Sequence, residues 1–169
     1  MRTSLRRLGV LTTTLVAAVA LASPAHAGYD PYDDGTNNDD ETLMNTAACA
    51  DQYSSEFPFH IFYNSNLGGS YRNLKYGVYD FDALRLGGST STAQPLKFCM
   101  LGVSSPWPGS GQKIKNNAAS ARNDHYKYVA RVYYFSGYNG PEDVLNPYES
   151  RARFTSVYNE NASFRYWVP

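Results

Sequence analysis

Short runs of aromatic and β-branched residues, separated by clusters of Gly, Asn and Ser, dominate the chain after about residue 57. The runs His60–Tyr63 and Tyr126–Phe135 each lead into a turn, and a third run covers Ser163–Val168. Val78–Leu84 alternates apolar and polar residues with a period of two, which is typical of a strand with one buried face. These patterns predict short strands joined by turns, and therefore an all-β fold.

Two pairs of landmarks recur along the chain and indicate an internal repeat. The turn Tyr63–Gly69 aligns with Tyr134–Gly140 at an offset of 71 residues, whereas Ala119–Arg122 aligns with Ala162–Arg165 at an offset of 43. The first copy therefore holds 28 more residues between its landmarks, and we place them around Gly87–Gly111. Because long loops in compact domains are commonly functional, this insertion is a candidate working surface.

The first 27 residues have the three parts of a secretory signal peptide. Basic residues come first, an apolar run from Leu8 to Ala22 follows, and Ala25–Ala27 supplies a small-x-small cleavage site. We therefore predict a secreted, extracellular protein with an acidic leader and short linker over residues 28–56 and one domain over residues 57–169. No later stretch approaches the roughly 20 apolar residues of a membrane helix, so no membrane partner is expected.

Charge is distributed unevenly along the predicted mature chain. Gly28–Tyr71 carries eight acidic residues and no Lys or Arg, whereas Arg72–Pro169 carries 12 basic and seven acidic residues. Gly28–Asn45 has little apolar periodicity and is expected to be a flexible leader, with a short helix over Thr42–Tyr53. The body lacks the concentrated positive charge that nucleic-acid binding requires, so nucleic acid is excluded as a partner.

Cys49 and Cys99 are the only cysteines in the chain. In an oxidising compartment such a pair usually forms one disulfide, and two free thiols are the alternative. The bond would close a loop of about 50 residues and stabilise the fold by about 4 kcal/mol in the chain-entropy treatment. It would also anchor the predicted insertion at Cys99, which favours an ordered loop.

Recognised catalytic motifs are absent from the sequence. The predicted mature chain has only two histidines, His60 and His125, and contains no His-Glu-x-x-His, no Gly-x-Ser-x-Gly and no phosphate-binding glycine loop. Asp80 and Asp82 would share one face of a strand, as glycosidase carboxylates do, but a solvated strand edge is the commoner reason for such a pair. We therefore predict that the protein is not an enzyme.

The landmarks resemble, in order, those of peptidase inhibitor family I36, a group of secreted actinobacterial proteins. They are the aromatic run into Tyr63–Gly69, the stretch Gly111–Asn123, the second aromatic-Gly turn and Tyr158–Arg165. The resemblance covers roughly His60 to Trp167 and implies a βγ-crystallin-like fold, with two Greek-key motifs packed as a small sandwich. This chain departs from the family at Phe59–His60, where members often have a Cys, and Gly87–Pro108 resembles no part of it.

The resemblance implies a proteinase inhibitor, and the insertion offers a loop that suits this function. An inhibitor presents an exposed loop whose ordering cost the fold has already met, and a disulfide is a common means to that end. The candidate inhibitory residues are Phe98, Cys99, Met100 and Leu101, whose apolar side chains suit the pocket of a thermolysin-like metalloproteinase. The alternative is that they pack inward around the disulfide. We expect the protein to be a monomer and its partner to be an extracellular proteinase.

The competing hypothesis is a calcium-binding or purely structural module of the βγ-crystallin type. Such calcium sites follow the pattern Asn/Asp-Asn/Asp-x-x-Ser/Thr-Ser, which supplies the oxygen ligands that a hard cation requires. The candidate ligands are Asn116, Asn117 and Ser120 in the first copy and Asn159 and Ser163 in the second. Ala121 and Phe164 replace the final Ser of the pattern. The alternative is that the two serines hydrogen-bond the hairpin over which each repeat folds.

Overall fold

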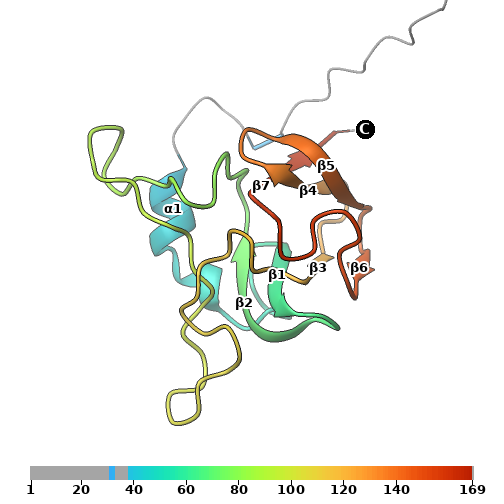
Figure 1. Cartoon of the computed structure of the whole chain (residues 1–169), viewed down its shortest axis with the longest axis horizontal. Helices are drawn as coiled ribbons and strands as arrows, with labels where there is room; N and C mark the ends of the chain where they lie inside the picture. The colour runs from blue at the N-terminus through green and yellow to red at the C-terminus, as the bar shows by residue number, and fades with distance from the viewer. Residues whose placement is uncertain (1–30, 33–37, 169) are drawn as a thin grey trace, which may run out of the picture.

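Two antiparallel sheets share one hydrophobic core in the computed structural model, which describes residues 31–32 and 38–168 (Figure 1). The predicted signal peptide lies outside these residues. The first sheet has the strand order β2-β1-β3-β6 and the second the order β5-β4-β7. The strands are β1 (Phe59–Asn64), β2 (Gly68–Leu74), β3 (Ser120–Asn123), β4 (Val129–Phe135), β5 (Asn139–Leu145), β6 (Ser150–Arg151) and β7 (Ser163–Trp167). The predicted all-β class is confirmed.

Strands β1, β4 and β7 lie where the three aromatic runs predicted them, but the strand predicted over Val78–Leu84 is wrong. This segment forms only isolated backbone bridges, at its two ends. The chain turns at Asp80, whose carboxylate accepts the N–H of Asp82 at 2.9 Å and whose carbonyl accepts the N–H of Ala83 at 3.0 Å. Asp side chains favour such local turns, so the alternation of apolar and polar residues reflects a turn here.

The internal repeat predicted from the sequence appears as two matching sets of hydrogen bonds. The hydroxyls of Ser120 and Ser163 each donate to a carbonyl at the end of a strand, at 2.6 and 2.7 Å, and each accepts an N–H from the following hairpin turn at 3.1 Å. Their partners are Asn64 and Leu67 in the first repeat unit, which contains β1 to β3, and Phe135 and Tyr138 in the second unit, which contains β4 to β7. The hairpin interpretation of the two serines is therefore confirmed.

Each unit contributes a segment to the sheet of the other. Strand β6 comes from the second unit and pairs with β3, whereas Val78 comes from the first unit and pairs with Phe164 in β7. The rings of Phe59 and Phe164, one from each sheet, stack with centroids 4.2 Å apart. Because the two units exchange backbone pairing and share one core, we expect them to unfold together.

The insertion lies in the first unit, between Phe81 and Ile114. The equivalent residues of the second unit, Phe154 and Val157, are separated only by residues 155–156. The inserted segment leaves the body as two loops, one beside α1 (Asp39–Met44) and one, drawn in yellow, that projects away from the sheets (Figure 1). This position agrees with the insertion predicted around Gly87–Gly111.

Residues 39–44 and 46–49 are helical and lie against the body, in partial agreement with the short helix predicted over Thr42–Tyr53 but not with a flexible leader up to Asn45. A 3₁₀ helix over Thr46–Cys49 follows α1. The buried guanidinium of Arg72, in β2, donates to the carbonyls of Thr42 at 2.6 Å and Leu43 at 3.0 Å. Burial lowers the pKa of Arg72 to about 10, so it remains charged at neutral pH and holds the end of α1.

The acidic residues of the leader also hold part of the insertion. The Asp39 carboxylate accepts the N–H of Arg85 at 2.8 Å, and the Asp40 carboxylate accepts the N–H of Gly87 at 2.7 Å. Carboxylates that accept backbone N–H groups form relatively strong hydrogen bonds. The first inserted loop is therefore attached to the start of α1.

We expect Ser120→Ala and Ser163→Ala each to lower the free energy of unfolding by about 1–3 kcal/mol, since each removes the two hydrogen bonds of a fully buried hydroxyl. Urea unfolding of both variants measures the two costs. Ser104→Ala is the control, because Ser104 is exposed on the second inserted loop, far from both hairpins in the sequence. A cost below that of the control at either site would contradict the equivalence of the two hairpins.

The leader makes a second attachment through Tyr32, whose hydroxyl lies 2.9 Å from Nε2 of His125. The Nδ1 atom of His125 accepts the N–H groups of Lys127 and Tyr128, both at 2.9 Å. That nitrogen therefore carries no proton, and the proton of the neutral ring lies on Nε2. The rings of Tyr76, Tyr128 and Tyr166 lie 5.5–6.1 Å from that of Tyr32. Docking of Tyr32 therefore uses the neutral form of His125.

We expect acid to destabilise the protein through His125. Burial, with a smaller effect from Lys127, lowers the pKa of His125 below its usual 6.5. The unfolded chain therefore binds this proton first, so stability present above pH 6.5 is lost as the pH falls through the lowered pKa. Melting temperatures at pH 7 and pH 5 should differ less for His125→Gln than for the wild type. An equal drop in both proteins would contradict this role of His125.

Candidate functional site

The predicted disulfide is confirmed: Cys49 and Cys99 are bonded, with their Cα atoms 5.6 Å apart. Cys49 is the last residue of the 3₁₀ helix and is exposed. Cys99 is buried at the point where the second inserted loop leaves the body. The bond therefore joins the leader to the base of this loop. We call residues 99–110 the projecting loop.

Strand β2 fixes both ends of the projecting loop. The N–H of Cys99 donates to the Tyr71 carbonyl at 2.9 Å, and the Cys99 carbonyl accepts the Ser70 hydroxyl at 2.5 Å. The backbone N–H of Ser70 donates to the Pro108 carbonyl at 2.7 Å. These bonds hold the outgoing and returning segments side by side, so the loop has a defined base even apart from the disulfide.

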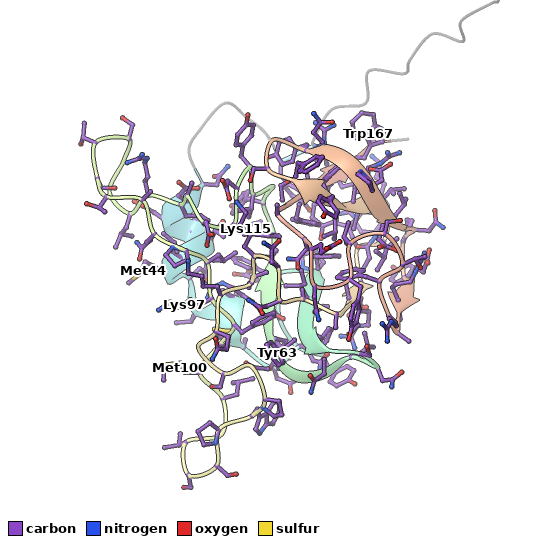
Figure 2. The ribbon with its side chains drawn as sticks, in the orientation of Figure 1. Met44, Tyr63, Lys97, Met100, Lys115 and Trp167 are labelled. Atoms are coloured by element: carbon purple, nitrogen blue, oxygen red, sulfur yellow. A yellow bond between two sulfur atoms is a disulfide. The ribbon has the colours of Figure 1, made fainter. Side chains whose placement is uncertain are left out.

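The four candidate inhibitory residues divide between core and solvent. Phe98 and Cys99 are buried, and Leu101 is half-buried, as the inward-packing alternative predicted. The Met100 side chain is 85% exposed, and Figure 2 shows it on the projecting loop, away from the sheets. A single unbranched apolar side chain is thus exposed to solvent next to the buried Cys99.

Apolar side chains continue to the tip of the projecting loop. Val103 is fully exposed, and the Trp107 side chain is about half exposed. A cavity of about 270 Å³ opens between the two arms of the loop, lined by Met100, Leu101, Gly102, Val103, Pro106 and Ser110. Contiguous exposed apolar surface on a soluble protein commonly marks a site of interaction. The tip therefore presents chemistry suited to an apolar pocket of another protein.

Gly109 is essential to the base of the projecting loop. Its φ is +84°, and a Cβ atom at this position would lie 2.1 Å from Cγ of the Tyr63 ring. That ring also contacts Phe98 edge-on, with centroids 5.6 Å apart, and Figure 2 shows Tyr63 near the point where the loop leaves the body. Only glycine combines this φ with such a close approach. The returning arm is therefore pressed against β1.

The candidate calcium ligands Asn116 and Asn159 lie at the junction of the two units. The N–H of Asn116 donates to the Asn161 carbonyl and that of Asn159 to the Ala118 carbonyl, both at 2.9 Å. Both asparagines line a cavity of about 380 Å³, together with Lys115, Tyr134, Phe135, Ser136, Glu160 and Ala162. The structure thus brings the first residues of the two predicted loops to one site.

Lys115, one of the residues that line this cavity, uses its ammonium group in two hydrogen bonds. Nζ of Lys115 donates to Oδ1 of Asp80 at 2.8 Å and to the Ser136 hydroxyl at 3.0 Å. The Asn117 amide donates to the Lys115 carbonyl at 3.2 Å, and the hydroxyls of Ser120 and Ser163 are engaged by the hairpins. Residues 31–32 and 38–168 contain no group of three or more His, Cys, Asp or Glu side chains that could hold a metal ion. Calcium binding stays a prediction for a calorimetric titration.

The two aspartates considered as a carboxylate pair each contact a lysine instead. Burial alone would raise the pKa of Asp80, but the hydrogen bonds from Lys115, Asp82 N–H and Ser136 outweigh it and hold this pKa below its usual value. Asp82 lies 3.5 Å from Nζ of Lys113. An ionised carboxylate with a lowered pKa is unsuited to act as a general acid. Asp80 and Asp82 therefore form separate ion pairs, with Lys115 and Lys113 respectively.

His60 is fully buried in β1. Its Nδ1 lies 2.7 Å from the Asn73 amide oxygen, and its Nε2 lies 3.2 Å from Oδ2 of Asp124. Burial lowers the pKa of His60 below its usual 6.5, which favours the neutral ring. The Asn73 amide in turn donates to the carbonyls of Ala47 and Ala50, both at 2.9 Å. His60 and Asn73 thus fix the 3₁₀ helix that carries Cys49.

Among the helices of the described segments, none has the length and apolar content needed to cross a membrane. Comparison of the chain with protein-family models, with curated proteins and with solved structures gave no match.

Proposed function

We propose that the protein is a secreted inhibitor of an extracellular proteinase, with a metalloproteinase of the thermolysin type as its target. The projecting loop would enter the active-site cleft, and Met100 would fill the apolar specificity pocket. The observation that carries this proposal is the 85% exposure of Met100 directly beside the buried, disulfide-bonded Cys99. The resemblance to peptidase inhibitor family I36 supports the same function.

Pre-organisation of the loop is the physical basis of the proposal. A flexible segment pays an entropic cost when it binds, and a loop that is already ordered avoids most of this cost. The disulfide, the hydrogen bonds from Ser70 and the contact between Gly109 and Tyr63 all restrict the base of the loop. The apolar tip can then be buried in an enzyme cleft with a net gain in free energy.

We also propose that the fold is of the βγ-crystallin type, a sandwich of two Greek-key units. The matched serine-to-hairpin hydrogen bonds and the exchange of β6 and Val78 between the two sheets support this assignment. In such a scaffold the insertion is an addition to one of two equivalent units. The inhibitory activity is then a property of the insertion rather than of the shared fold.

An inhibition panel tests the proposed function. Residues 28–169, with the disulfide formed, should slow at least one thermolysin-type metalloproteinase at micromolar concentration in a peptide-cleavage assay. Serine proteinases in the same panel show whether the target class is correct. Failure to inhibit any metallo- or serine proteinase at that concentration would exclude the proposed function.

A further inference from the structure

Met100, on the projecting loop, lies between two residues whose backbones are fixed. Strand β2 fixes Cys99, as described above. On the other side, the N–H of Leu101 donates to the Ser110 hydroxyl at 2.9 Å, and the Leu101 carbonyl accepts the N–H of Trp107 at 3.0 Å. Within the described residues, the N–H and carbonyl of Met100 form no backbone hydrogen bond. Both groups therefore remain available to pair with another chain.

Ser110 reaches the outgoing arm of the loop from the returning arm. Its hydroxyl oxygen lies 3.2 Å from the Leu101 carbonyl oxygen and 3.4 Å from that of Cys99. Each of these carbonyls already accepts one other hydrogen bond, from Trp107 N–H and from the Ser70 hydroxyl, so the shorter distance places the single hydroxyl proton of Ser110 on the Leu101 carbonyl. One serine side chain thus binds both backbone groups of Leu101.

The two neighbours of Ser110 place its hydroxyl at this point. Gly109 and Gly111 have φ values of +84° and +72°, conformations that L-residues with side chains rarely adopt. Gly109 lies against the Tyr63 ring, and the N–H of Gly111 donates to the Phe98 carbonyl at 3.3 Å. The two glycines therefore allow the backbone to turn on both sides of Ser110, and these turns place its side chain against the outgoing arm of the loop.

We infer that Ser110 is the positioning residue of the inhibitory loop, an inference that rests on the proposed function. By holding Leu101, its hydroxyl keeps the Met100–Leu101 peptide group in one orientation. The matching partner is a proteinase cleft that pairs with the N–H and carbonyl of Met100, as with an added strand, and takes its unbranched apolar side chain into a deep apolar pocket. Ser110 itself makes no contact with the enzyme.

Two substitutions at Ser110 test the inference. Ser110→Ala removes the hydroxyl and should raise the inhibition constant about tenfold, since the two hydrogen bonds between this hydroxyl and the Leu101 backbone order the loop. Ser110→Thr keeps a hydroxyl and should restore inhibition to near the wild-type value. Ser104→Ala is the matched control, a serine on the same loop that is exposed. Amide hydrogen exchange of Leu101, followed by NMR, should be about tenfold faster in Ser110→Ala than in wild type.

The amide measurement separates failure of this inference from failure of the proposed function. Wild-type inhibition by Ser110→Ala, or unchanged Leu101 exchange in that variant, would overturn the positioning role. If the wild-type protein inhibits no proteinase, the proposed function falls and with it the enzyme partner of the loop. Faster Leu101 exchange in Ser110→Ala would then still support Ser110 as the residue that orders the loop.

Discussion

Replacement of Met100 by aspartate should raise the inhibition constant about 100-fold or more. A side chain that anchors an interface in an apolar pocket typically contributes about 2 kcal/mol or more to binding, and a carboxylate in its place adds a desolvation cost. Stability should not change, because the Met100 side chain is 85% exposed. Inhibition assays and thermal unfolding of the same samples measure the two effects.

Met44→Asp is the matched control for this experiment. Met44 is also a surface methionine, 65% exposed, but it ends α1 rather than lying on the projecting loop (Figure 2). Its replacement should leave the inhibition constant within about twofold of the wild-type value. Equal losses in both variants would point to a general effect of charge, and full inhibition by Met100→Asp would assign the contact to another part of the surface.

Removal of the disulfide should give the largest loss of stability. In Cys49→Ala/Cys99→Ala, we expect the free energy of unfolding to fall by about 4 kcal/mol, because the bond closes a loop of 50 residues in the unfolded chain. Urea unfolding of both proteins at equal pH measures the difference. A loss below about 1 kcal/mol would show that the unfolded chain is already constrained in this region.

The same double variant also tests what holds the projecting loop. The bond from the Cys99 N–H to the Tyr71 carbonyl and the bond from the Ser70 hydroxyl to the Cys99 carbonyl involve only backbone groups of residue 99, so they survive the loss of its sulfur. At a temperature where the variant is folded, its inhibition constant should therefore rise less than tenfold. A complete loss of inhibition by folded protein would mean that the disulfide, rather than β2, orders the loop.

The parts of the fold that the sequence predicted are those governed by local patterns. Aromatic runs predicted β1, β4 and β7, and the two pairs of landmarks together predicted the repeat and its insertion, because side-chain alternation and turn residues act over short distances. Val78–Leu84 failed because an aspartate-stabilised turn produced the same alternation as a strand. The short helix predicted over Thr42–Tyr53 overlaps α1 and the 3₁₀ helix, but the earlier start of α1 and its attachment to the body were missed because its partner Arg72 is distant in the sequence.

The candidate site was predictable to the same extent. Its position in the chain followed from the insertion and from Cys99, and the apolar character of Met100 was visible in the sequence. Which of the four residues face solvent was not, since Phe98 is as apolar as Met100 and is buried by contact with Tyr63. The role of Ser110 depends on a hydrogen bond across the loop, and the flanking glycines were its only sequence signal.

The short connection of the second unit shows what the insertion replaces. In the second unit the Asp143 carboxylate accepts the N–H groups of Thr155, Ser156 and Val157 at 2.8–3.1 Å. These bonds hold the short connection in which only residues 155–156 separate Phe154 from Val157. In the first unit the corresponding junction admits a long excursion, which enters the core at Leu84 and again between its two loops, at Leu96 and Phe98. Residues 100–107 contribute no side chain to this core, so under the proposed function their sequence can change with the target while the scaffold retains its stability.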